Sequence, residues 1–539
     1  MSSPSVEFNR AREHGEYVTE TDNFIKNDLL YAKQIVAVFH RGEEYGDVLF
    51  ARSAEQYLTS LGEAFELARR EVTHRAQADL RQRFLDAFPD LMRNLITAVM
   101  QRNETRPPRT LSPSRSPAPS VPSDVTLEYS VTIRAGEAVN EDYHACLRPF
   151  YGPDRSSYAP LINLAGSTAA TLQTRLPLAK AVAEAQSELM PDDPLALAEQ
   201  TTTHLLNLSC ITLPRWSSQH VRTYAFAAHE HMHRVLRRVE MLVGAALTEY
   251  ERLHRRDAED VLTRAGSPNE DRAPTFHEVL SFPKALPADD RAVVELYRNF
   301  YAIYFQLWGF FRRPTVRRDV NALTLQTMAW LHTIELLADA GAIVLAGPAF
   351  AFAYRTVYTP DTATELKMLG ASEAPRHPPT VVRTQLHIAL LRTLGFNTAA
   401  DRLEAEPQWK EALADAQRNS LLRDYFTFLT KDVYSEIDYV IDLIGSAGAA
   451  PYDLRKRTNG EQGSLASAEQ TLNAAWLDLA HGVETQGKFM PNDMVNVRPA
   501  DALNAIWYKR MEEGDADPKN RLAWRVALRN CNAHGAPTT

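Results

Sequence analysis

The sequence predicts a mainly α-helical, multi-domain protein with one or two short strands. The chain has 539 residues, more than a single hydrophobic core usually spans. Hydrophobic residues make up 45% of it and charged residues 24%, a globular composition that excludes a disordered or collagen-like chain. Over most of the chain, apolar residues recur at spacings of three and four, the period of an amphipathic helix.

The N-terminal region, residues 1–105, is predicted to form a small helical unit. Within it, Leu58, Leu61 and Phe65 lie at helical spacings. Residues 106–124 follow and contain five prolines between Pro107 and Pro119. Because proline cannot occupy the interior of a helix, we interpret this segment as a linker with polyproline character.

The rest of the chain divides into three predicted parts. Residues 125–200 form a mixed region, in which residues 125–133 (VTLEYSVTI) alternate apolar and polar side chains as a strand does. Residues 201–445 form the central helical domain, residues 257–274 of which are expected to be a surface loop. Residues 446–539 form a C-terminal helical region.

Charge and cysteine content restrict the partners and the compartment. With 59 basic and 68 acidic side chains the net charge is -9, which argues against a nucleic-acid partner. Three widely separated cysteines favour a reducing compartment. The most apolar run, residues 341–354, is shorter than the roughly 20 residues that cross a bilayer. The expectation is therefore a cytoplasmic protein.

The strongest motif is HEHMH at residues 229–233, which satisfies the pattern HExxH. On a helix, His229 and His233 share one face and can bind one metal ion, while Glu230 lies close enough to take a proton from a metal-activated water. Zinc suits imidazole ligands and hydrolytic chemistry. The alternative is a helix with three surface histidines, His231 among them. The apolar residues 225–228 argue against it, because burying histidines without partners is costly.

A third ligand is expected in the apolar residues 330–350. Glu335 and Asp339 are four residues apart there, and two carboxylates in an apolar helix need a positive partner. We assign Glu335 as the third ligand and expect Asp339 to accept a hydrogen bond from a ligand histidine or to pair with an arginine. His332, one turn before Glu335, is a rival ligand.

A third element begins at His377, which two prolines fix just before a predicted helix. A histidine held there could donate a hydrogen bond to the oxyanion that forms when water attacks a carbonyl. Arg383, on the first turns of that helix, could pair with Asp339. The simpler alternative is a proline-initiated helix with a solvent-exposed histidine.

Together, HEHMH, ELLAD (residues 335–339) and HPPTVVR (residues 377–383) resemble the gluzincin metallopeptidases of the CAAX prenyl endopeptidase and HtpX type. The resemblance covers roughly residues 205–395 and implies a zincin-like core. It implies zinc on His229, His233 and Glu335 with Glu230 as general base, a substrate or transition-state role for His377, and supporting roles for Asp339 and Arg383. Most members of that group are integral membrane proteins, whereas this chain shows no clear span.

The function expected from these residues is hydrolysis of a peptide or protein substrate. A strand at residues 209–213, just before the metal helix, could be an edge strand that holds the substrate extended. One alternative is a helical interaction scaffold with a structural or silent metal site. Another is a peripheral membrane protein that uses the aromatic residues 297–313, which we interpret instead as core. The oligomeric state is left open.

Overall fold

The computed structural model describes residues 4–40, 45–70, 75–103, 124–151, 158–165, 170–187, 194–214, 221–253, 291–313, 322–358, 360, 377–446, 500, 503, 504 and 507. Helix accounts for 87% of these residues, which confirms the prediction of a mainly α protein. The predicted linker, the surface loop at 257–274 and most of the C-terminal region lie outside the described residues.

The helices and strands follow one another along the chain with no internal repeat in their order. The first part contains α1 (Pro4–His40), α2 (Tyr45–Ala68), α3 (Arg75–Asn103), α4 (Asp124–Leu147), β1 (Leu161–Ala165), β2 (Thr171–Gln173), α5 (Leu176–Ser187), α6 (Pro194–Asn207) and β3 (Cys210–Pro214). The second part contains α7 (Phe226–Leu253), α10 (Arg291–Phe311), α11 (Ala322–Ala346), α12 (Pro348–Val357), α14 (Thr380–Thr393), α15 (Asn397–Ala405), α16 (Pro407–Arg418), α17 (Ser420–Phe428) and α18 (Tyr434–Ser446).

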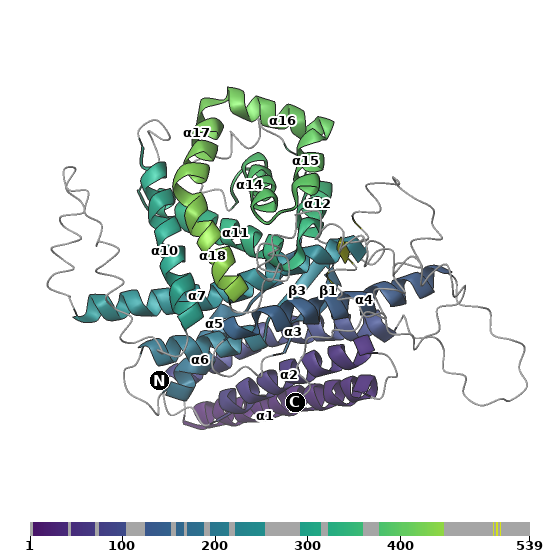
Figure 1. Cartoon of the computed structure of the whole chain (residues 1–539). Helices are drawn as coiled ribbons and strands as arrows, with labels where there is room; N and C mark the ends of the chain where they lie inside the picture. The colour runs from purple at the N-terminus through teal and green to yellow at the C-terminus, as the bar shows by residue number, and fades with distance from the viewer. Residues whose placement is uncertain are drawn as a thin grey trace, which may run out of the picture.

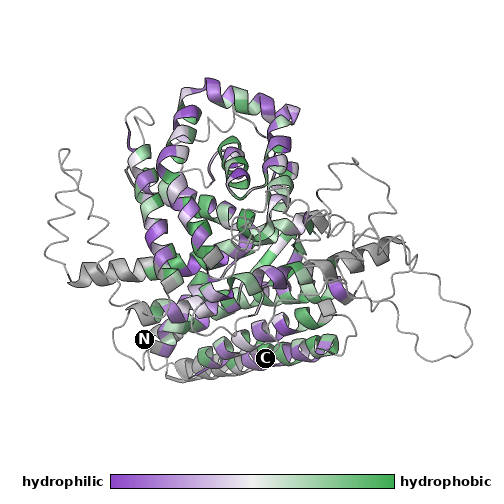
Figure 2. Ribbon diagram, viewed as in Figure 1, coloured by the Kyte–Doolittle hydropathy of each residue, from purple (hydrophilic) through white to green (hydrophobic). Residues whose placement is uncertain are grey.

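The helices form two groups that meet at α7 (Figure 1). Helices α1 to α6 lie across one side of α7 in stacked layers, and α10 to α18 stand on the other side, around α11 and α14. Hydrophobic residues concentrate where the helices face one another, and hydrophilic residues dominate outer helices such as α16 (Figure 2). Helix α7 therefore lies at the junction of the two groups.

A three-stranded sheet lies beside α7 and has the strand order β1-β3-β2. Strand β3 pairs in parallel with β1 and antiparallel with β2, and every residue of β3 is buried. The strand expected at 209–213 is therefore present, but it is the central strand and not an edge. The edge strand on the α7 side is β2, only three residues long.

The outer edge of β1 is covered by α3. The Gln101 side chain donates to the Leu164 carbonyl (2.6 Å) and accepts from the Leu164 N–H (3.1 Å), so it takes the place of a neighbouring strand. Leu161 and Cys210 of the sheet share a hydrophobic core with α1, α2, α3 and α5. The N-terminal helices are thus packed directly against the sheet.

The strand predicted at residues 125–133 is wrong, because these residues begin the helix α4. From Ile133 onward the buried positions follow a helical pattern that includes Asn140, Tyr143 and Leu147. Helix α4 packs against both α2 and α7, and this tertiary context overrides the β-branched, alternating start of the segment. The two short strands β1 and β2 fall in a region that the sequence indicated only as mixed.

Helix α11 is the most enclosed element of the second group. Residues Thr324–Ala346 are long and apolar enough for a bilayer span by length and composition, and 89% of their most apolar window is buried inside the protein. The aromatic residues of α10 pack on it, for example Phe300 and Tyr304 against Trp330. The expectation that this aromatic segment packs in the core agrees with its burial.

Helices α7 and α11 approach closely where Gly341 faces Met232. A Cβ atom on Gly341 would lie 2.4 Å from both Cγ and Sδ of Met232, much closer than two such atoms can approach. Gly309 of α10 has nothing within 4 Å of the corresponding position. The absence of a side chain at Gly341 therefore sets the spacing of the two helices.

We expect Gly341→Ala to destabilise the protein by about 1–3 kcal/mol, because the extra methyl overpacks the α7–α11 contact. Gly309→Ala, the matched control on an open helix face, should be neutral or stabilising by up to about 1 kcal/mol through helix propensity. Urea unfolding followed by circular dichroism measures both. A Gly341→Ala variant as stable as the control would contradict this account of the interface.

Candidate metal centre

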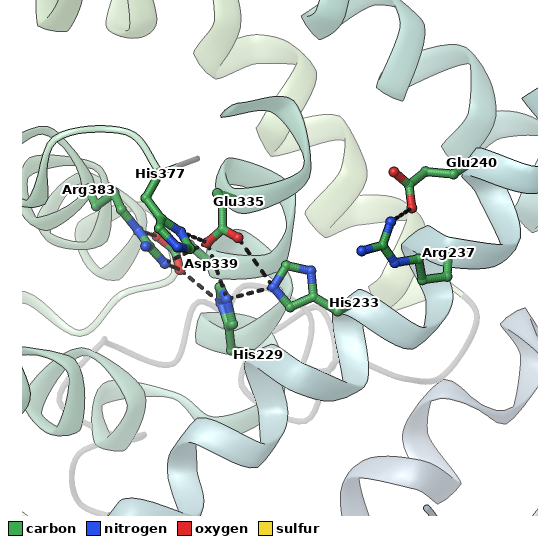
Figure 3. A network of polar contacts seen from close by, with 8 residues as sticks. All are labelled: His229, His233, Arg237, Glu240, Glu335, Asp339, His377 and Arg383. Carbon is green, nitrogen blue, oxygen red and sulfur yellow. Dashed lines mark hydrogen bonds and ion pairs between the residues drawn. The ribbon is translucent and has the colours of Figure 1, made fainter. Parts of the chain in front are cut away.

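The candidate site is built on α7, where a tight turn of 3-10 helix at Val221–Ala225 leads directly into the metal-binding motif. His229 and His233 are one helical turn apart and face Glu335 on α11 (Figure 3). Met232 lies between them in sequence and makes the contact with Gly341 described above. The packing that spaces the two helices therefore also sets the distance between the ligands.

Three possible metal ligands converge at this point. His229 Nε2 lies 3.0 Å from His233 Nε2, and the Glu335 carboxylate oxygens lie 3.5 Å from each of these nitrogens. A tetrahedral ion with bonds of about 2.0–2.2 Å places its ligand atoms roughly 3.3–3.5 Å apart. The buried His229, His233 and Glu335 group can therefore hold a metal ion.

Asp339, one turn after Glu335, is fully buried and holds the site together. It accepts two hydrogen bonds from Arg383, at 2.7 Å from Nε and 2.6 Å from NH2. It also lies 3.0 Å from Nδ1 of His229 and 2.9 Å from Nε2 of His387. Because Nδ1 of His229 is held by this carboxylate, Nε2 is the nitrogen directed at the metal position.

The electrostatics of the site come from buried groups. Burial opposes ionisation of Asp339 and Glu335, but the Arg383 guanidinium outweighs it and holds the pKa of both carboxyls well below the usual range. Burial lowers the pKa of His233 to about 3, so this imidazole is neutral, as a ligand must be. Burial opposes a charge on His229 too, but the two carboxylates outweigh it and raise its pKa.

Glu230 lies on the same helix and lines the same cavity, which has a volume of about 750 Å³. The Leu172 backbone of β2 donates a hydrogen bond to it. Burial raises the pKa of the Glu230 carboxyl to about 7, although His229 and the Leu172 N–H act in the opposite direction. A carboxyl with that pKa can exchange a proton near neutral pH.

His377 lies at the mouth of the cavity, where 60% of its side chain is exposed. Its Nδ1 is 3.1 Å from Glu335 Oε2. Pro378 and Pro379 follow, and α14 begins directly after them at Thr380. The structure thus brings this histidine and Arg383 to the two conserved-in-space sides of Glu335 and Asp339, on one element that begins after the prolines.

The other two histidines considered in the sequence lie elsewhere. His332 is buried on α11 and its Nδ1 is 2.7 Å from the Tyr425 hydroxyl, so it contributes no atom to the His229, His233 and Glu335 group. His231 points away from that group, with Nε2 2.8 Å from Asn140 of α4 and Nδ1 3.3 Å from the Tyr151 hydroxyl. Its role is to tie α7 to α4.

Several residues of the site were not predicted from the sequence. His387 lies one turn after Arg383, and this spacing on one helix face was the available signal. Phe350 of α12 stacks on the His229 ring with centroids 5.7 Å apart, and the Arg383 guanidinium lies 4.8 Å from the Tyr354 ring centre. These two aromatic residues looked like ordinary core positions. Arg237, which also lines the cavity, had no motif to mark it.

Comparison of the chain with protein-family models, with curated proteins and with solved structures finds no match. The site therefore has to be interpreted from its own geometry.

We expect about one divalent transition-metal ion per purified chain, and much less in His233→Ala and Glu335→Ala, because each removes one of three ligands. His332→Gln, which alters a histidine outside the group, should keep the ion. Mass spectrometry of metal content, with circular dichroism to verify folding, checks all four proteins. Loss of the ion from His332→Gln but not from Glu335→Ala would contradict the assignment.

Asp339→Asn should destabilise the metal-free protein by about 3–5 kcal/mol at neutral pH, because it leaves Arg383 buried without its carboxylate. Asp79→Asn, which breaks an exposed pair with Arg83, should cost less than about 1 kcal/mol. Because folding depresses the pKa of Asp339, its contribution is present at neutral pH and is lost as the pH falls below the unfolded value of about 3.9. Unfolding titrations in a chelator at pH 7 and pH 4 should show the deficit of Asp339→Asn shrinking; an equal deficit at both would contradict the ion-pair explanation.

Proposed function

We propose that this protein is a zinc-dependent endopeptidase that hydrolyses peptide bonds in a peptide or protein substrate. One observation carries the proposal: two histidines and a glutamate converge in a cavity that a carboxyl of suitable pKa, Glu230, also lines. The resemblance of the three sequence motifs to gluzincin metallopeptidases supports the same function.

Zinc is proposed because of the ligands and their spacing. Two imidazoles and one carboxylate are a typical set for a catalytic zinc, which leaves a fourth position open. A zinc ion held there supplies a Lewis acid that polarises a carbonyl and lowers the pKa of water. The neutral state of His233 and the anchoring of His229 by Asp339 favour metal binding over an unoccupied pair of rings.

Glu230 is the proposed general base. It would accept a proton from the attacking water and deliver it to the leaving amine, a role that needs a pKa near the working pH. The hydrogen bond from the Leu172 backbone holds its carboxyl in place. His377, exposed at the cavity mouth, is proposed to donate a hydrogen bond to the oxygen of the scissile carbonyl.

A peptide is the proposed substrate because strand β2 borders the cavity. Residues Thr171 and Leu172 line it, and β2 is the terminal strand of the described sheet on that side. An extended peptide can add to such an edge through main-chain hydrogen bonds. This role, first expected for the strand at 209–213, passes to β2.

Glu230→Gln should lower peptide hydrolysis by about 10²–10⁴-fold, because it removes the base while keeping the shape of the side chain. Its metal content should equal that of the wild type. The zinc-loaded protein is incubated with a peptide library and cleavage is followed by mass spectrometry, with Glu66→Gln on an exposed helix face as the control. Undiminished hydrolysis by Glu230→Gln, or none by the zinc-loaded wild type, would overturn the proposal.

A further inference from the structure

The cavity continues beyond the ligands toward Arg237, one helical turn after His233 on α7. Four residues of helix correspond to about 6 Å along the axis, which is about two residues of an extended peptide. Figure 3 shows the Arg237 guanidinium beyond the His233 ring, on the side away from His229. A substrate lying across the site would pass this arginine within about two residues of the bond being cut.

Arg237 is held in place and remains accessible. Its NH1 donates to Glu240 Oε2 (2.7 Å), and the other oxygen of Glu240 accepts from the Trp330 indole of α11 (2.8 Å). The Glu240 side chain is only 11% exposed, whereas that of Arg237 is 45% exposed. The anchoring carboxylate thus lies against α11, and the positive group faces outward. A guanidinium has five N–H donors in a planar fork, so one bond to Glu240 leaves others for a ligand.

The two ends of the cavity differ in character. Among the described residues that line it, two carry positive charge: Arg237 and Arg383. The Arg383 side chain is only 6% exposed and binds Asp339 through two hydrogen bonds. The wall on the far side of the ligands is aromatic, with Phe226, Phe350, Tyr354 and Tyr358. The accessible positive charge is therefore at the Arg237 end.

We propose that Arg237 is a specificity residue that binds a substrate carboxylate about two residues from the scissile bond. An arginine pre-positioned by Glu240 and Trp330 can form a bidentate pair with a carboxylate, which lysine or a neutral residue cannot reproduce. The carboxylate can come from an aspartate or glutamate side chain or from the C-terminus of a short peptide. The inference rests on the proposed peptidase function.

The experiment uses the zinc-loaded full-length protein and sets of peptides that differ at one position within three residues of the cleaved bond. Each set has aspartate, asparagine or lysine there, and is made with a free or an amidated C-terminus. We expect the wild type to favour aspartate over asparagine by about tenfold in kcat/KM. Dependence on the side chain with an amidated terminus identifies the acidic residue, and dependence on the free terminus identifies the α-carboxylate.

Arg237→Gln should bring the preference for the carboxylate close to one, and Arg237→Glu should favour lysine. Because the preference is a ratio measured within each variant, a general loss of activity cancels from it. Metal content is measured in both variants, since His233 is one turn away. An unchanged preference in Arg237→Gln, or none in the wild type, would overturn the inference.

Binding separates this inference from the proposed function. Metal-loaded Glu230→Gln is titrated with the same peptides, and Glu230→Gln combined with Arg237→Gln serves as its control. Tighter binding of carboxylate peptides that the second substitution abolishes would support the inference even if the wild type cleaved none of them, and the peptidase proposal alone would then fail. Equal binding of aspartate and asparagine peptides would overturn the inference.

Discussion

The site depends on one buried carboxylate, Asp339. A charge removed from water is stable only when it is paired and hydrogen-bonded, and Asp339 meets this condition by contacting Arg383, His387 and His229. Those partners come from α14 and α7, while Asp339 itself belongs to α11. The demand of one buried charge for partners therefore fixes three helices relative to one another and, with them, the orientation of the His229 ring.

Helix α7 carries different chemistry on its two sides. His229 and His233 face α11, where the lack of a side chain at Gly341 lets Met232 approach. On the opposite side His231 contacts Asn140, and Arg238 pairs with Glu199 of α6 at 2.8 Å. Burial holds the pKa of His231 well below its usual value, so this third histidine of the motif is a neutral structural group. A metal helix held on both sides cannot easily rotate, which keeps its ligands in register with Glu335.

What the sequence predicted of the site reflects local geometry. His229 with His233 and Glu335 with Asp339 are each four apart, so a single helix places both members of each pair on one face. The contacts between elements were less accessible. Gly341 facing Met232 and Phe350 stacking on His229 are tertiary contacts without a local signature. Strands β1 and β2 are short, and their pairing with β3 supplies the stability that their own residues do not. Residues 125–133 were predicted as a strand because their alternation is local, whereas the packing that makes them helical lies on α2 and α7.

Charge balance explains why a metal ion and the N-terminal part of α14 serve the same site. Glu335 and Asp339 place two negative charges in the core, and Arg383 compensates for one of them. The remaining negative charge raises the pKa of His229, so a proton and a metal ion compete for the same ring. Metal binding would release that proton and leave the carboxylates compensated by the ion and by Arg383. Arg237 takes no part in this balance, because Glu240 and Trp330 anchor it separately at the cavity rim. The same helix thus separates the residues that hold an ion from the one that can select a substrate.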